Sequence, residues 1–96
     1  MLILKALSLA PMHGWGISQR IQQLSRDALQ IGQGSLYPAL QRMLMEGWVT
    51  GEWGISETKR RVRFYNLTKD GLKQLKQEIA QYEQVSAAIQ GILRTA

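Results

Sequence analysis

The sequence contains no cysteine and a single histidine. Without cysteine there are no disulfide bonds and no thiolate chemistry, which is typical of the reducing cytoplasm, where we expect this chain to act. One histidine, His13, cannot form a two-histidine metal site, and no group of carboxylates has ligand spacing. The sequence therefore predicts neither a bound metal nor a cofactor.

Long hydrophobic runs and signatures of catalysis are also missing. No segment approaches the roughly 20 apolar residues that a membrane-spanning helix needs, so we expect a soluble chain with no membrane partner. The apolar segment 1–10 lacks the basic start of a signal peptide and is broken by Lys5, so we interpret it as a helix. Gly32-Gln33-Gly34 lacks the long loop and the lysine of a nucleotide site, and enzymatic function has little support.

Positive charge is what the chain has in excess. Its 96 residues include 12 lysines and arginines against 7 acidic residues, a formal net charge of +5. Such a field steers polyanions toward the surface, which favours an anionic partner such as nucleic acid. A chain of this length forms one domain with a modest core, so a partner chain would add stability.

Apolar periodicity predicts three short helices in the first half of the chain. The first lies in residues 1–10, and the second follows the His13-Gly14 turn. Ser35 is the predicted side-chain cap of the third helix, which ends at Gly47. Between the second and third helices, the alternating segment 29–31 predicts a very short strand.

The second half of the chain predicts a β-hairpin and one long helix. Segments 48–53 and 62–67 are predicted strands that flank a polar, basic stretch. Thr68 is the predicted cap of the last helix, with Asp70 in its first turn. Apolar residues then recur at the alternating three- and four-residue spacing of a coiled-coil seam. The seam consists of Leu72, Leu75, Ile79, Tyr82, Ile89 and Leu93.

This order of elements is that of a winged helix-turn-helix domain. We therefore predict a mainly α fold with a small β-hairpin, divided into a winged-helix DNA-binding domain, residues 1–67, and a long C-terminal dimerisation helix, residues 68–96. The seam has no evident place in so small a core, and pairing of two copies would bury it. The alternative is that the helix folds back on its own domain.

Three strings of the sequence resemble the PadR family of bacterial transcriptional regulators. They are ILKALSLAPMHGWGI, GSLYPALQRMLMEGWVTGEW and RRVRFYNLTKDGLKQL, and together they span nearly the whole chain. The resemblance implies a homodimer that binds a pseudo-palindromic operator in double-stranded DNA, usually as a repressor. Trp15 departs from the pattern, since the family more often has tyrosine there, so a phosphate contact by that hydroxyl is lost.

The third helix is the predicted reading helix, because residues near the N-terminus of such a helix reach base edges in the major groove. Its candidate DNA-binding residues are Gln33, Ser35, Tyr37, Pro38, Gln41 and Arg42. Pro38 fits the first turn, where a backbone amide has no internal partner. Leu36, Leu40 and Leu44 are predicted to face the core.

A basic cluster lies on the predicted hairpin tip and the strand that leaves it: Lys59, Arg60, Arg61 and Arg63. Close cations repel one another unless an anion relieves them, so we expect this cluster to contact phosphates or the minor groove. The alternative is a solvated basic loop. A protein-interaction module is a competing function, but it has no need for such a cluster beside a reading helix.

The hairpin also carries four aromatic residues, Trp48, Trp53, Phe64 and Tyr65. We predict that most of them are core, because large rings pack across a strand pair or onto helices. The second hypothesis is a cavity that holds a small aromatic effector, since some relatives in the family use such ligands. An effector of this kind would relieve repression.

Overall fold

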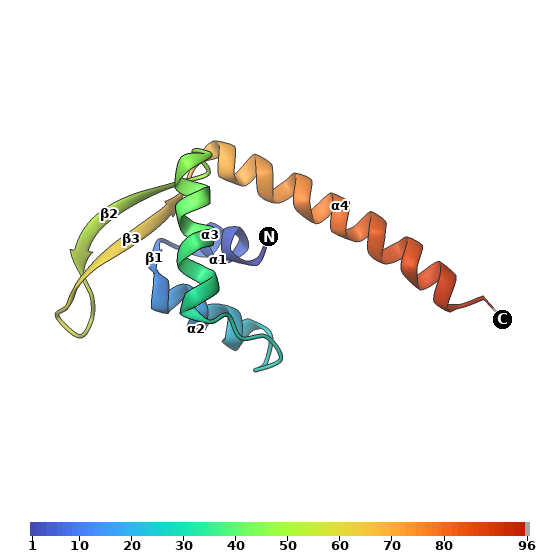
Figure 1. Ribbon diagram of the computed structural model, residues 1–96, viewed down its shortest axis with the longest axis horizontal. Helices are drawn as coiled ribbons and strands as arrows, with labels where there is room; N and C mark the ends of the chain where they lie inside the picture. The colour runs from blue at the N-terminus through green and yellow to red at the C-terminus, as the bar shows by residue number, and fades with distance from the viewer. Residues whose placement is uncertain (96) are drawn as a thin grey trace.

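A computed structural model describes residues 1–95 of the chain. The elements, in chain order, are α1 (Leu2–Leu9), β1 (Met12–His13), α2 (Gly14–Leu24), α3 (Gln33–Met45), β2 (Val49–Ile55), β3 (Arg61–Leu67) and α4 (Lys69–Leu93). Figure 1 shows the first three helices gathered into a body, with the β2–β3 hairpin extending on one side and α4 on the other. The predicted winged helix-turn-helix fold with a long C-terminal helix is confirmed. Ala96, which ends the predicted segment 68–96, lies outside the described residues.

Strand β1 is an element that the sequence did not predict. It pairs antiparallel with β3, Met12 opposite Tyr65 and His13 opposite Phe64, and gives a sheet of order β1-β3-β2. The strand predicted at residues 29–31 is wrong, because that segment is an irregular loop. Alternation over three residues does not make a strand unless a neighbouring strand offers hydrogen-bonding partners.

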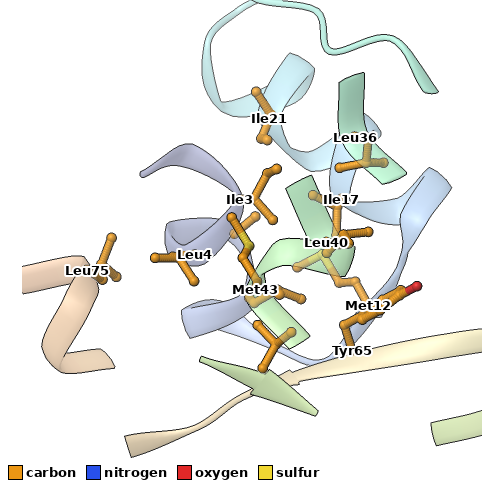
Figure 2. Close-up of a cluster of buried hydrophobic side chains, with 13 residues drawn as sticks. Ile3, Leu4, Met12, Ile17, Ile21, Leu36, Leu40, Met43, Tyr65 and Leu75 are labelled. Carbon is orange, nitrogen blue, oxygen red and sulfur yellow. The ribbon is translucent and has the colours of Figure 1, made fainter. Parts of the chain in front are cut away.

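The core lies between α1, α2, α3 and one face of the sheet (Figure 2). Its largest fully buried side chains are Leu4, Ile17, Leu36 and Leu40. These residues come from α1, α2 and α3, and Ile17, Leu36 and Leu40 belong to the apolar faces that periodicity predicts. The core therefore fixes how α3 is held against α1 and α2.

Leu75 corrects the interpretation of the last helix. Its side chain is 3% exposed within the core, and Ile79 packs against the same cluster. Leu75 and Ile79 therefore belong to the domain itself, because α4 starts alongside α1 before it leaves the body, whereas Leu72, the first residue of the seam, is 41% exposed. Beyond Ile79 the seam is open to solvent, with Tyr82 59%, Ile89 51% and Leu93 76% exposed.

Hydrogen bonds fix the junction where α3, the hairpin and α4 meet. Gly47, with a φ of +76°, ends α3 as predicted, and the Trp48 N–H donates to the Met43 carbonyl at 3.0 Å. The Thr68 hydroxyl oxygen accepts from the Gly71 N–H at 3.0 Å, which confirms the predicted cap of α4. The same hydroxyl donates to the Gly47 carbonyl at 2.7 Å, so α4 is tied to the end of α3.

Candidate nucleic-acid interface

Helix α3 begins earlier than the sequence predicts. Gly32 is the N-cap, and the Ser35 N–H already donates to the Gly32 carbonyl at 3.1 Å. Ser35 therefore lies within the first turn and is not the cap. Pro38 lies inside the helix rather than in its first turn, so the Gly34 carbonyl lacks the usual backbone donor four residues later.

One side of α3 forms the wall of a groove of about 800 Å³. Gln33, Tyr37 and Gln41 recur every four residues and therefore lie on the same side of the helix. Across the groove lies the β2–β3 hairpin, residues 49–67, which we call the wing. It contributes Arg60, Arg61 and Arg63 to the lining of the groove. The fold thus brings the predicted reading helix and most of the predicted basic cluster together around one hollow. His13, Gly14, Trp15, Trp53 and Tyr65 also line it.

The other predicted DNA-binding residues lie outside this groove. Pro38 and Arg42 are further round α3 and line a second hollow, together with Trp48 and residues of α4. Ser35 is exposed at the start of α3, and Lys59 is exposed at the tip of the hairpin.

The hairpin tip has a defined shape. The Ser56 N–H donates to the Arg60 carbonyl at 2.8 Å, and the Lys59 N–H donates to the Ser56 carbonyl at 2.9 Å. The Ser56 hydroxyl oxygen also accepts from the Arg60 N–H at 3.2 Å. Lys59 adopts the left-handed conformation, with a φ of 62°. Because a non-glycine side chain at such a φ costs about 1 kcal/mol, the tip keeps a lysine where glycine would be more stable.

The basic side chains of the wing have no acidic partner. Among residues 1–95, none of Lys59, Arg60, Arg61 and Arg63 forms an ion pair with a carboxylate. Glu57 is the acidic residue in the groove lining. The positive charge of the wing is therefore free to meet an external anion such as phosphate.

The four aromatic residues of the hairpin do not share one cavity. Tyr65 is buried in the core, whereas Trp53 is 63% exposed, so the prediction of a core position is wrong for Trp53. The reason is that β2, which carries Trp53, extends past the body (Figure 1). Trp48 lines the hollow beside α4, away from Trp53.

Two residues of the groove, Trp15 and Trp53, were not among the DNA-binding residues predicted from the sequence. Both are exposed and line the groove, Trp15 from the start of α2 and Trp53 from the wing. Sequence spacing does not distinguish an exposed tryptophan from a buried one. At the same end of α2, the His13 Nδ1 accepts the Gly16 N–H at 3.2 Å and caps the helix.

The described residues offer little else that could bind a ligand by charge. Within residues 1–95 no three histidine, aspartate or glutamate side chains are placed to hold a metal ion. The same residues include no helix with the length and apolar content to span a membrane.

Comparisons with known proteins agree with this geometry. The model of the family described as "Transcriptional regulator PadR-like family" matches residues 3–77. A transcriptional regulator from Clostridium thermocellum has 28% identity and a TM-score of 0.87 over 97% of this chain and 90% of that chain. No curated protein matches the sequence.

Two further solved structures share the fold. A PadR-like transcriptional regulator from Bacillus cereus has 26% identity and a TM-score of 0.80 over 98% of this chain and 89% of that chain. A PadR family transcriptional regulator from Eggerthella lenta has 25% identity and a TM-score of 0.79 over 99% and 83%. The family match covers the three core helices, the wing and the start of α4. This chain belongs to the PadR-like family of transcriptional regulators.

Proposed function

We propose that this regulator is a homodimeric repressor that binds a pseudo-palindromic operator in double-stranded DNA. Family membership implies DNA-binding regulation. The observation that carries the proposal is the groove in which Gln33, Tyr37 and Gln41 of α3 face the unpaired arginines of the wing. To recognise a DNA sequence, a protein needs a helix that contacts base edges and cations that contact the phosphates beside them. Here α3 and the wing arginines lie next to each other in this arrangement.

In this proposal α3 enters the major groove and the wing follows the DNA backbone. The Gln33 and Gln41 amides can each donate to and accept from a base edge, and the Tyr37 ring can contact a thymine methyl group. The wing arginines contact phosphates or the minor groove. Ser35, Pro38, Arg42 and Lys59 are exposed and remain candidates for flanking contacts.

The exposed part of α4 supports dimerisation. Beyond the turns that pack on the body, α4 carries a row of exposed apolar side chains: Tyr82, Val85, Ile89, Ile92 and Leu93. Leu2 and Leu9 of α1 are partly exposed as well. Two copies related by a two-fold axis would bury this surface and set two reading helices roughly 34 Å apart, one turn of DNA. We therefore propose residues 68–96 as the dimerisation helix.

A small aromatic effector is the second part of the proposal. The feature that favours it is the hollow beside α4, of about 480 Å³, where half-buried Trp48 lies near Arg42 and Glu78. A ligand there would touch both the reading helix and α4. A thermal-shift screen with aromatic compounds tests it, with Trp48→Ala as the control variant that should lose any shift.

Selection of bound fragments from a random pool of duplex DNA tests the central proposal. We expect enrichment of a site with two-fold symmetry whose half-sites lie about one helical turn apart. Substitution of Arg60 and Arg61 by alanine should weaken binding and lower the salt dependence, because each lost phosphate contact releases about one fewer counterion. Recovery of unrelated fragments, or of a site without symmetry, would contradict the proposal.

A further inference from the structure

The wing arginines differ in how they are held. Successive side chains of a strand point to opposite faces of the sheet. In the β2–β3 register, Val49 pairs with Leu67, Trp53 with Arg63, and Ile55 with Arg61. All these residues therefore share one face. That face packs on the core near Val49 and continues toward the hairpin tip as the wall of the groove.

Arg61 lies against an aromatic ring on this face. Its guanidinium carbon is 4.8 Å from the centre of the Trp53 ring, within the range of a cation–π interaction. Trp53 is a diagonal neighbour of Arg61 across the two strands. Because Arg61 has no carboxylate partner in the described part of the chain, residues 1–95, the indole ring is the contact that holds its guanidinium.

Arg63 lies over a position where a side chain is missing. A β-carbon on Gly51 would be 2.8 Å from the Arg63 guanidinium carbon, closer than real β-carbons approach. The guanidinium carbon is also 5.8 Å from the centre of the Tyr65 ring. Glycine at position 51 thus leaves the space that the Arg63 side chain occupies beside the buried Tyr65.

The two cations at the tip have no such support. Within residues 1–95, aromatic contacts of this kind are made by Arg61 and Arg63, not by Lys59 or Arg60. Lys59 and Arg60 are exposed. A long side chain that is already fixed loses less conformational entropy when it binds. Binding of DNA by Arg61 and Arg63 therefore costs less entropy than binding by Lys59 and Arg60.

We propose that Trp53 and Gly51 are positioning residues of the DNA interface, which preset Arg61 and Arg63 for contact with the nucleic acid. This inference rests on the proposed function, since it assigns roles within the same groove. Trp53 acts through Arg61, and Gly51 acts through Arg63. Neither residue needs to touch DNA.

Trp53→Leu tests the first half, because leucine keeps the apolar bulk and all the charges but removes the aromatic face. Fluorescence anisotropy with a labelled duplex of mixed sequence measures binding. We expect about three- to tenfold weaker binding, from the lost cation–π contact and the freed side chain. Trp53→Phe keeps a ring and should restore most of the affinity.

A double-mutant cycle separates this role from a general structural one. In an Arg61→Ala background, Trp53→Leu should have no further effect on binding, because the residue that it positions is gone. In an Arg60→Ala background the two losses should multiply. Unfolding in urea shows whether each variant keeps its fold.

Gly51→Ala tests the second half without a change of charge. The new methyl group meets the flexible end of Arg63 and not backbone, so the fold should survive while the guanidinium is displaced. We expect about three- to tenfold weaker binding in the native background, and no further loss in an Arg63→Ala background.

The outcomes distinguish this inference from the proposed function. Wild-type protein that does not bind duplex DNA would overturn both. Wild-type protein that binds, with Trp53→Leu and Gly51→Ala variants that bind equally well, would overturn the positioning roles alone. The positioning roles would also be overturned if Trp53→Leu weakened DNA binding by the same factor with and without Arg61→Ala, and Gly51→Ala by the same factor with and without Arg63→Ala.

Discussion

The ring of Tyr37 on α3 packs against Gly14 at the start of α2. Its hydroxyl oxygen lies 3.0 Å from the position that a β-carbon on Gly14 would occupy, and two of its ring carbons lie at 3.1 and 3.2 Å. Tyr37 is still half-exposed at the edge of the groove. The missing side chain of Gly14 therefore sets where the ring of a candidate base-reading residue lies.

Gly14→Ala is expected to push this ring out of place. The crowding should cost about 1 kcal/mol of unfolding free energy, measured in urea, since overpacking of this size is partly relieved by rotation of an exposed ring. Binding to the selected operator should fall about tenfold, within the range for loss of one base contact. Binding to random duplex should fall less.

Gly16→Ala on the same helix is the matched control. The nearest atoms to its added β-carbon lie at 3.6 Å, an ordinary contact, so operator binding should not change. If Gly14→Ala binds the operator as the wild type does, the position of Tyr37 is unimportant for recognition.

Periodicity was enough to predict α2 and α3 and most of their buried faces, although Leu24, on the predicted apolar face of α2, is exposed. Ile17, Leu36 and Leu40 are buried as their spacing predicts, and Thr68 caps α4 as its residue type predicts. These features depend on residues a few positions apart, which a sequence shows directly. The fold class followed from their order.

Features that depend on pairing between distant residues could not be predicted. Strand β1 exists because Met12 meets Tyr65, and nothing near Met12 in the sequence signals that partner. The contact between Trp53 and Arg61 depends on the register of β2 and β3. Leu75 was assigned to a dimer seam because of the apolar spacing along α4. That spacing does not show which turns of the helix pack on the domain of the same chain.

Lys59 offers a test of function against stability. At a φ of 62° a glycine is free of the strain that a lysine side chain carries, so Lys59→Gly should raise the unfolding free energy by about 1 kcal/mol. The same change removes a cation from the wing tip and should weaken binding to random duplex, with a smaller salt slope. Calorimetry and anisotropy at several salt concentrations measure the two effects.

Lys59→Asn is the companion variant, because asparagine tolerates the left-handed conformation better than lysine and also lacks the charge. Both variants should bind DNA more weakly while neither is less stable than the wild type. A variant that is more stable and binds as tightly as the wild type would remove Lys59 from the interface.

Gly71 in the first turn of α4 lies close to the backbone of Trp48. A β-carbon at this position would overlap the Trp48 carbonyl oxygen and lie 2.6 Å from a methyl carbon of Leu67. The Trp48 carbonyl cannot retreat easily, because it accepts the Thr68 N–H at 3.0 Å. Gly71→Ala should therefore lower the unfolding free energy by about 2 kcal/mol or more.

Gly91→Ala near the far end of the same helix is its control. Among residues 1–95, no atom apart from its chain neighbours and the nearby helix backbone lies within 4 Å of the added β-carbon, and alanine is the better helix former, so stability should rise by about 0.5–1 kcal/mol. Equal effects of the two substitutions in urea unfolding would show that the start of α4 is not packed as described.

The dimer is tested most directly on the part of the seam that the single chain leaves exposed. Leu75 and Ile79 are unsuitable, because they pack on the body and their loss would unfold the domain. Tyr82 and Ile89 are one heptad apart on the exposed part of α4. Tyr82→Asp with Ile89→Asp places two carboxylates in the proposed interface, where burying an unpaired charge costs several kcal/mol.

We expect this double variant to sediment as a folded monomer at micromolar concentrations at which the wild type is a dimer. Because each monomer carries one reading helix, it should also lose most of its affinity for a symmetric operator, while its affinity for a single half-site should be unchanged. Gln84→Asp with Ala87→Asp adds the same charges to the opposite side of α4, as its helical spacing places them, and should leave the dimer intact. A wild-type chain that sediments as a monomer, or a Tyr82→Asp and Ile89→Asp variant that stays dimeric, would show that α4 does not join the two copies.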